Sequence, residues 1–585
     1  MTDPETALDA QATTPRKAGN SRFVARMIES HSILGLAFAA LIYIVSLTGA
    51  FTVFAHEIEL WENAWAPTVA SVSGEVYQNA LEEAYAARDP DGDLDSLVAY
   101  GPSEFAPALL VRLNETDEQG NFQQTNWIAD PQTGALLGKA EAPLAHLIEE
   151  LHVALHLPTP WGRYLVGLLG VCMFSLVISG ILAHPTIFKD AFKLRVDRNK
   201  RTAWTDVHNR LSVWGLPFHL VLTFTGGFLG LAGLIVGAVA MIAYEGDQER
   251  ALASIQGPMP VEGRALEEFP PIASMVETAR TDGRPVELLV MQKPANAGGV
   301  TTVNVLDKRL LDQTQSLIFR NSGAFIESYG GAGAPGGIRA LAMLQPLHYG
   351  TFGGYPVKLL YFVMALALTW VTSSGMKIWF ARRQQQGRPV PRLNAAWQGM
   401  TAGLTLGLSA ATLVAASGLG ELALAACLGG WAAAFALFLS LPARASVLYP
   451  RLLLGSGACL VVAAGLWLVE HGAKGIVPTA VDGSVRERDQ PVVRSRESAD
   501  TVDDVLAEQG GEGQLEERDL ALDLGGLPVA PAVAKTQGVQ GIHGKSPSGG
   551  ADPTNHWTRT YAEGSRITRL GCFGCFSNSP SARRH

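Results

Sequence analysis

Seven apolar stretches, each close to the length of a membrane-spanning helix, constrain this chain more than any other feature of its sequence. They lie at about 31–55, 163–184, 210–243, 357–380, 399–418, 420–441 and 448–470. The hydrocarbon core of a bilayer is about 30 Å thick, so a crossing helix needs about 20 apolar residues. Only 17% of the 585 residues are charged, against about a quarter in soluble proteins. The sequence therefore predicts a mainly α-helical multi-pass membrane protein with about seven spans, surrounded by membrane lipid.

Basic residues beside the spans indicate which side of the membrane each connection occupies. They gather before the first span, between the second and third, and after the fourth. The clusters are Arg16, Lys17, Arg22 and Arg26; Lys189, Lys193, Arg195, Arg198, Lys200 and Arg201; and Arg382, Arg383, Arg388 and Arg392. Cytoplasmic connections are enriched in Lys and Arg. We therefore expect a cytoplasmic N-terminus and two long connections on the outer side of the membrane.

These assignments divide the chain. The expected segments are a cytoplasmic N-terminus at 1–26, spans at 27–55, 163–184, 208–243 and 357–380, periplasmic domains at 56–162 and 244–356, cytoplasmic loops at 185–207 and 381–398, three further spans within 399–470, and a tail at 471–585. The tail is rich in Gly, Ser, Pro and charge without apolar periodicity, which predicts disorder. Its Cys572 and Cys575 form a single C-x-x-C without a surrounding fold, a weak signal for redox or metal chemistry.

The unit of span, long connection and span occurs twice. His31 is followed 17 and 18 residues later by Thr-Gly, and His208 is followed by Thr-Gly at the same spacing. The second and fourth spans also match with a one-residue slip. LHVALHLPTPWGRYLVG leads from His152 to a Ser-Gly pair, and LHYGTFGGYPVKLLY leads from His348 to another. The repeat places His31 and His208 at cytoplasmic ends, and His152 and His348 on the outer side.

Each long connection reads as a small α+β module. In the first, EVYQNALEEAYAARD predicts a helix, and the turn at 130–134 contains the Pro and Gly that suit a reversal between strands. In the second, PPIASMVETAR could form the helix, and the turn lies at 321–323. A helix followed by strands and a D-P-x-T-G type turn resembles the PepSY domain. Gly331, Gly333 and Gly336 fit G-x-G-x-x-G, but a membrane span follows them, so we expect a loop.

Residues 22–383 as a whole resemble the PepSY-associated transmembrane family, which includes inner-membrane ferric-siderophore reductases. The motifs that carry this resemblance are LTGAF, FTGGF, LHVALHLPTPWGRYLVG, DVHNRLSVWGLPFHL and LHYGTFGG. The resemblance implies haem b held by histidines in the membrane and electron transfer outward to ferric iron.

Histidine is a common axial ligand of haem iron, and polar residues within a bilayer are usually functional. We expect two haems b, with His31 and His208 holding the iron of one and His152 and His348 that of the other. The alternative is that these four residues cap helix ends or bind headgroups. Other candidates remain open; they are His184 and His219 for the inner haem and His156 for the outer one. On a straight helix His219 would lie about 16 Å deeper than His208, which argues against one haem using both.

The resemblance implies a bacterial inner-membrane location and a ferric siderophore or another iron chelate as the partner. Reduction to Fe²⁺ weakens the hold of hard oxygen ligands, which suits release of the iron. The electron donor stays open between a quinol and a cytoplasmic reductase. A net charge of −9 argues against a nucleic-acid partner. The competing hypothesis is a membrane-anchored PepSY module that binds peptides or regulates proteases without redox activity.

Overall fold

The computed structural model describes residues 18–472 except 91, 118–119, 185, 190, 193–199, 281–282, 308–310 and 313. The predicted tail, with Cys572 and Cys575, therefore lies outside the described residues from 473 onward. Within the described ranges, six helices are long and apolar enough to cross a membrane, or seven if one bent pair counts as a single span. The six are α1 (Ala18–Thr52), α5 (Trp161–Ala183), α12 (Gly354–Gln385), α13 (Pro391–Ala416), α14 (Ala423–Ser440) and α15 (Ala445–His471). The multi-pass helical class is confirmed.

The third span is not the continuous helix that was predicted at 208–243. It begins as α6 (Lys200–Trp214), turns by 72° and continues as α7 (Leu216–Gly230), followed by the short apolar α8 (Ala232–Ala243). Pro217 stands in the first turn of α7, where a missing N–H costs nothing, whereas within one continuous helix it would break the hydrogen-bond ladder. The depth that a straight helix would assign to His219 is therefore wrong.

The eight strands of the described residues form one antiparallel sheet with the order β4-β3-β2-β1-β5-β6-β7-β8. The strands are β1 (Asp93–Tyr100), β2 (Leu109–Thr116), β3 (Phe122–Ala129), β4 (Leu136–Lys139), β5 (Val286–Gln292), β6 (Val300–Leu306), β7 (Thr314–Arg320) and β8 (Phe325–Gly330). The turn at 130–134 joins β3 to β4, and the turn at 321–323 joins β7 to β8, as the sequence predicted. Gly331 and Gly333 lie in the connection between β8 and α11 (Gly336–Tyr349), as expected, whereas Gly336 is the first residue of α11.

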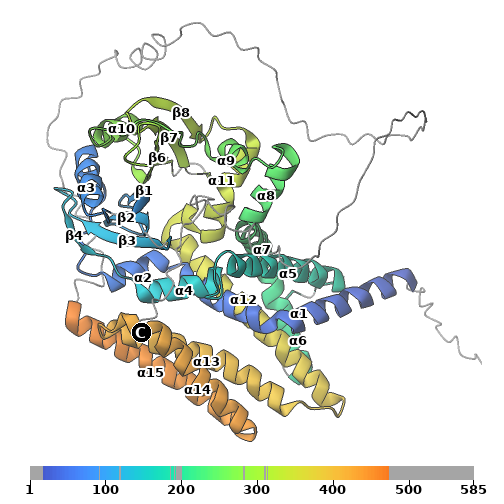
Figure 1. The fold of residues 1–585 in the computed structure, drawn as a ribbon. Coiled ribbons are helices and arrows are strands. Elements are labelled where there is room, and N and C mark those ends of the chain that lie inside the picture. The colour runs from blue at the N-terminus through green and yellow to red at the C-terminus, as the bar shows by residue number, and fades with distance from the viewer. Residues whose placement is uncertain are drawn as a thin grey trace, which may run out of the picture. The chain divides into compact units, whose positions relative to one another are not determined.

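The two expected modules are not separate domains, because β1 of the first pairs with β5 of the second. Val98 lies opposite Val290 in this pair. The predicted helices are present as α3 (Gly74–Ala86) and α10 (Ile272–Ala279), and both pack on the same face of the sheet in one shared core (Figure 1). An exposed strand edge invites pairing with another strand, and here each module covers an edge of the other.

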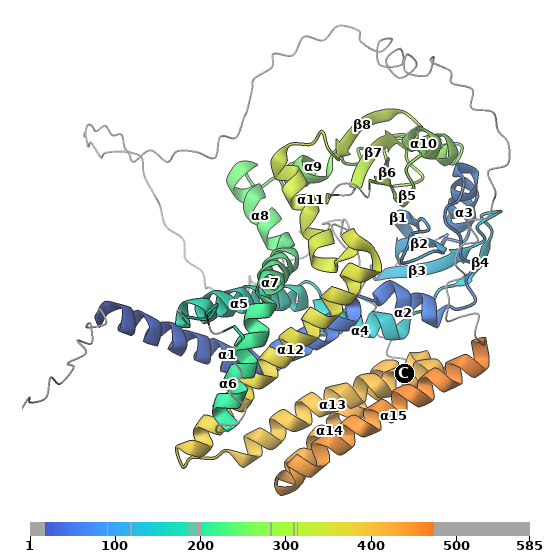
Figure 2. The ribbon, with the colours of Figure 1, turned by 180° about the vertical axis from the view of Figure 1, so that it is seen from behind.

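Short helices connect the sheet to the spans. They are α2 (Ala55–Glu62), α4 (Pro143–Val153), α9 (Gln248–Gln256) and α11. In the membrane layer α1 packs against α5 and α12, while α5 packs against α7 and α6 against α12. The three later spans pack together, and α13 also contacts α1 and α4 (Figure 2). Tyr43 of α1 meets Trp397 of α13 edge to face, with ring centroids 5.8 Å apart.

Candidate functional site

The fold brings four histidines together as two pairs at different depths of the helix layer. His31 of α1 and His208 of α6 have ring centroids 6.2 Å apart, with the rings nearly perpendicular at 86°. His152 of α4 and His348 of α11 have centroids 6.1 Å apart, with the rings nearly parallel at 19°. We call the first the loop-side pair and the second the sheet-side pair, because α4 and α11 follow the sheet directly along the chain.

The loop-side histidines are held by the same contacts in both halves of the repeat. Nδ1 of His31 donates to the carbonyl oxygen of Leu176 on α5 at 3.0 Å and lies 3.2 Å from Oγ of Ser179. The equivalent contacts of His208 join it to α12. They are 3.0 Å to the carbonyl oxygen of Val371 and 3.1 Å to Oγ of Ser374. The Ser-Gly pairs of the repeat therefore mark the helix turns against which these rings rest.

Each sheet-side histidine likewise bonds a span helix of its own half of the repeat. Nδ1 of His152 donates to the carbonyl oxygen of Val45 on α1 at 2.9 Å. His348 bonds the backbone of Leu222 on α7, and its Nδ1 lies 3.0 Å from Oγ1 of Thr225. The Thr225 hydroxyl donates its own proton to the Val221 carbonyl oxygen, so it accepts from His348. A proton on Nδ1 leaves Nε2 with its lone pair.

Glycines of the repeat make room for the four rings. A Cβ atom on Gly49 would lie 2.6 Å from the His152 ring, and one on Gly226 would lie 2.8 Å from the His348 ring. On the loop side the corresponding gaps are wider. They are 3.3 Å from Gly180 to His31 and 3.6 Å from Gly375 to His208. The Thr-Gly motif is thus explained by close approach of an imidazole to the helix backbone.

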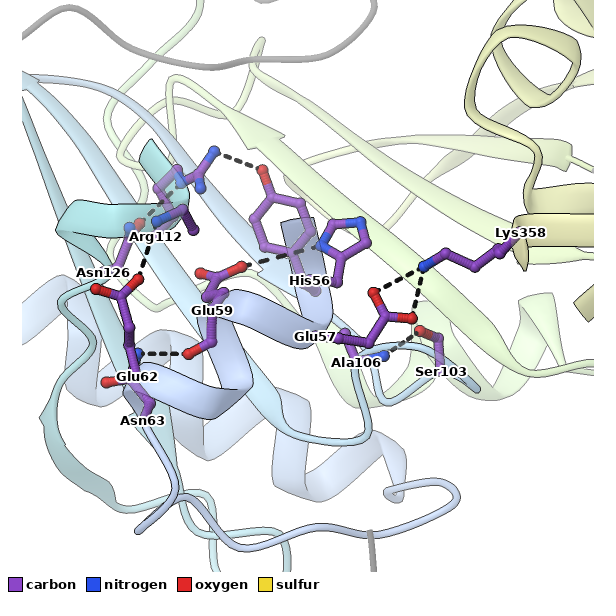
Figure 3. Close-up of polar contacts among 12 residues, drawn as sticks. His56, Glu57, Glu59, Glu62, Asn63, Ser103, Ala106, Arg112, Asn126 and Lys358 are labelled. Atoms are coloured by element: carbon purple, nitrogen blue, oxygen red, sulfur yellow. Dashed lines mark hydrogen bonds and ion pairs between the residues drawn. The ribbon is translucent and has the colours of Figure 1, made fainter. Parts of the chain in front are cut away.

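A polar junction holds α4, the helix that carries His152 (Figure 3). The carboxylate of Glu62 on α2 accepts from the backbone N–H groups of Leu144 and Ala145 at 2.9 and 3.0 Å. Because the first N–H groups of a helix have no partner within it, this carboxylate caps α4. Five residues before Glu62 on the same helix, Glu57 receives two hydrogen bonds of 2.6 and 2.7 Å from Nζ of Lys358 on α12. The junction ties α2, α4 and α12 together below the sheet.

Burial keeps the sheet-side imidazoles neutral. It lowers the pKa of His152, and burial together with the neighbouring His152 lowers the pKa of His348 to about 3. Nearby, Glu149 on α4 is only 8% exposed, and burial raises its pKa to about 8. Neutral imidazole is the form that binds a metal ion, so these surroundings favour ligation over an ionic role.

The separation within each pair would let its two imidazoles hold one haem iron between them. Bonds of about 2.0–2.1 Å from a metal ion to ring nitrogen and a ring radius of about 1.1 Å would separate two trans imidazole centroids by about 6.3 Å. Both observed separations, 6.2 and 6.1 Å, match that value. A hydrogen bond from Nδ1 to a backbone carbonyl is the usual support of a histidine that binds metal through Nε2. No three His, Cys, Asp or Glu side chains converge as a metal site among the described residues.

The other histidine candidates make contacts of different kinds. His156 follows α4 in a left-handed conformation with φ 55° and is exposed. His184 ends α5, with its Nδ1 3.5 Å from the Thr186 hydroxyl. His219 on α7 is 2% exposed and bonds the backbone of Met364. His56 lies 3.9 Å from Glu59, in agreement with a structural role. The structure therefore brings His31 together with His208 and His152 together with His348.

Several site residues escaped the sequence analysis. Glu57, Glu62, Glu149 and Lys358 lie within otherwise apolar or mixed segments, and no motif marks them. An available signal is the presence of two lysines, Lys358 and Lys377, within the apolar stretch at 357–380, since charge is expensive in a span.

Comparison with known proteins agrees with this architecture. The sequence model of a family described as "PepSY-associated TM region" matches residues 28–382. The chain is also 28% identical over 290 residues to an uncharacterized protein of Pseudomonas aeruginosa, a match that covers 47% of this chain and 73% of that protein. Both histidine pairs fall within the matched family region, whereas α13, α14 and α15 lie beyond it.

Proposed function

This chain belongs to the PepSY-associated TM region family, and we propose that it is a haem b protein that passes electrons across a bacterial inner membrane to periplasmic ferric chelates. The observation that carries the proposal is that the four histidines form two pairs. In each pair the distance between ring centroids suits two axial ligands of one iron. A haem bound at each pair would supply a one-electron centre that cycles between Fe³⁺ and Fe²⁺. Its axial ligands would be His31 with His208 and His152 with His348.

The separation of the two pairs along α1 supports one electron-transfer centre near each membrane surface. His31 lies 14 residues before Val45 on α1, and Val45 bonds His152. At 1.5 Å per residue the two levels are separated by about 21 Å, which is most of a bilayer core of about 30 Å. One centre near each surface would split the crossing into shorter transfers.

The proposed direction of transfer follows from the basic clusters and the sheet. Lys and Arg border the loop-side pair, which favours the cytoplasm for that side and for the N-terminus. The sheet would then lie in the periplasm, next to the pair from which a ferric siderophore or a similar chelate accepts its electron. Reduction would weaken the chelate and release iron.

A pyridine haemochrome assay on the purified protein tests the proposal. We expect two haems b per chain, with Soret and α bands that shift on reduction by dithionite and return when a ferric siderophore is added. A colourless protein, or haem that ferric chelates do not oxidise, would contradict it. A colourless protein would favour the competing hypothesis of a peptide-binding anchor.

Labelling of single cysteines tests the orientation. Gln132 and Ser322 are exposed at the two β-turns, and Gln386 is exposed after α12. In intact spheroplasts a membrane-impermeant thiol reagent should label Gln132→Cys and Ser322→Cys but not Gln386→Cys. The reverse pattern would place the sheet in the cytoplasm.

A further inference from the structure

A lysine held between two tryptophans lies beside the loop-side pair. Nζ of Lys377 on α12 is 4.1 Å from the ring centroid of Trp204 on α6 and 5.3 Å from that of Trp370 on α12. We call these three residues the Lys377 cluster. Among the described residues no carboxylate forms an ion pair with Lys377. Within the described part of the chain, the faces of the two indole rings offset its positive charge.

The cluster is within one helix turn of the residues that hold His208. Trp204 precedes His208 by four residues on α6, about 6 Å along the helix axis. Lys377 follows Ser374 by three residues on α12, and Oγ of Ser374 contacts the His208 ring. An electron released at this cluster would therefore have only a short path to the loop-side pair.

The cluster also opens toward lipid. Trp370 is 51% exposed, although it stands in the middle of a helix that is long and apolar enough to cross a membrane. Lys377 itself is half-buried. A ligand that reaches these rings from the side would come from the bilayer, whereas a soluble protein would approach the helix ends.

The repeat shows that neither the fold nor the histidine pair needs this cluster. The positions equivalent to Trp204, Trp370 and Lys377 in the first half of the repeat are Met27, Ser175 and Leu182. Yet His31 in that half makes the same two contacts as His208. A charged residue in a span is costly unless it serves a function, and here the symmetric site is built without one.

We propose that the Lys377 cluster binds the head group of a membrane quinol, which is the electron donor; this inference rests on the proposed function. The aromatic ring of the quinol would stack on the exposed Trp370 indole. The Lys377 ammonium would donate a hydrogen bond to a quinol oxygen, an interaction that strengthens when that oxygen loses its proton. Trp204 holds the ammonium in place from the other side.

The chemistry balances with the quinol as the sole reductant. One quinol gives up two electrons and two protons and becomes a quinone. The protons pass to cytoplasmic water near the basic end of α12. The electrons leave singly through the loop-side pair, so each quinol would reduce two ferric chelates to the ferrous state.

A binding measurement tests the site without turnover. The probe is 2-heptyl-4-hydroxyquinoline N-oxide, a quinone analogue whose fluorescence is quenched when it binds protein. Lys377→Leu, which installs the residue of the symmetric half, should weaken binding about tenfold or more, and Lys377→Arg should recover most of it. Leu182→Met, at the equivalent position, is the matched control and should bind like the parent. Equal binding by the parent and Lys377→Leu would overturn the proposal and leave Lys377 as a contact for lipid phosphate.

A stopped-flow measurement on the haem-loaded protein tests the role of the site. Decylubiquinol or menadiol should reduce the parent protein, and Lys377→Leu and Trp370→Ser should slow that reduction about tenfold, while dithionite reduces all variants alike. If neither quinol reduces the parent although dithionite does, the donor is not a quinol. If no haem is found at all, the proposed function fails, but the binding measurement still decides whether the site exists.

Discussion

The imidazole rings of His152 and His348 lie 19° from parallel with centroids 6.1 Å apart, although 195 residues separate them in the sequence. The loop-side rings have nearly the same separation but stand at 86°. Two sites that are equivalent by the repeat therefore differ in ring orientation. The sheet-side rings come from short helices outside the spans, whereas the loop-side rings belong to span helices, one of which is bent.

We expect the sheet-side pair to be required for one haem only. Replacement of His152 or His348 by Ala should lower the haemochrome stoichiometry from two to one and abolish ferric-chelate reduction, because one axial ligand is lost. His156→Ala is the matched control, four residues from His152 but exposed. Two haems and full activity in His348→Ala would disprove this assignment.

The difference in ring orientation should appear in the electron paramagnetic resonance spectrum of the oxidised protein. Perpendicular axial imidazoles give low-spin ferric haem a more anisotropic signal than parallel ones. We expect one signal of each kind, and His208→Ala should remove the anisotropic one while His348→Ala removes the other. Two identical signals would show that the rings rearrange when haem binds.

The glycines that face the histidines should differ in their tolerance of a methyl group. Gly49→Ala and Gly226→Ala place a Cβ at 2.6 and 2.8 Å from a ring, so each should displace the sheet-side haem. Gly375→Ala, with 3.6 Å available, should leave both haems in place. Gly35→Ala faces only Leu176 at 3.7 Å and serves as a control for helix propensity, which by itself favours Ala by up to about 1 kcal/mol. Haem content and thermal unfolding measure both effects.

The Lys358–Glu57 ion pair should couple the sheet to the spans. Lys358 is 1% exposed, whereas the Glu57 side chain is 23% exposed. Glu57→Met removes the ion-pair partner of Lys358, the more deeply buried of the two charges, and should lower the unfolding free energy by about 2–4 kcal/mol. Lys358→Met should lower the unfolding free energy by less. The double variant should be more stable than Glu57→Met alone. Additive effects in this double-mutant cycle would mean that the pair does not interact energetically.

Glu149 should make stability depend on pH. Burial raises its pKa to about 8 from the ordinary value of 4.5, so between these pH values the folded protein holds a proton that the unfolded chain has lost. Stability should therefore fall as pH rises through this window, by up to a few kcal/mol. Glu149→Gln cannot titrate and should show a smaller fall in melting temperature between pH 5 and 8.5. Burial also raises the pKa of Glu62 to about 7, so part of the dependence of stability on pH should remain in both the parent and Glu149→Gln. Parallel melting curves for parent and variant would exclude Glu149 as the cause.

Local patterns in the sequence were sufficient to predict the helical membrane class, most of the spans and the two β-turns. Apolar length is set by bilayer thickness, and turn residues act on their own backbone, so neither needs knowledge of distant contacts. The Thr-Gly and Ser-Gly repeats also marked positions that prove to touch the histidines. The expected ligation of haem by these histidines stays a prediction.

Tertiary structure alone decided how these parts combine. The pairing of β1 with β5 joins residues nearly 200 positions apart, and hydrogen bonding between two strand edges leaves no local signature in either strand. The bend before Pro217 depends on α6 packing against α12 and α7 against α5. Among seven candidate histidines, sequence could rank the pairs only by symmetry, because the carbonyl oxygens that hold them belong to Leu176, Val371, Val45 and Leu222 on neighbouring helices. A backbone carbonyl is the same for every residue type, so only the fold shows which one lies beside an imidazole.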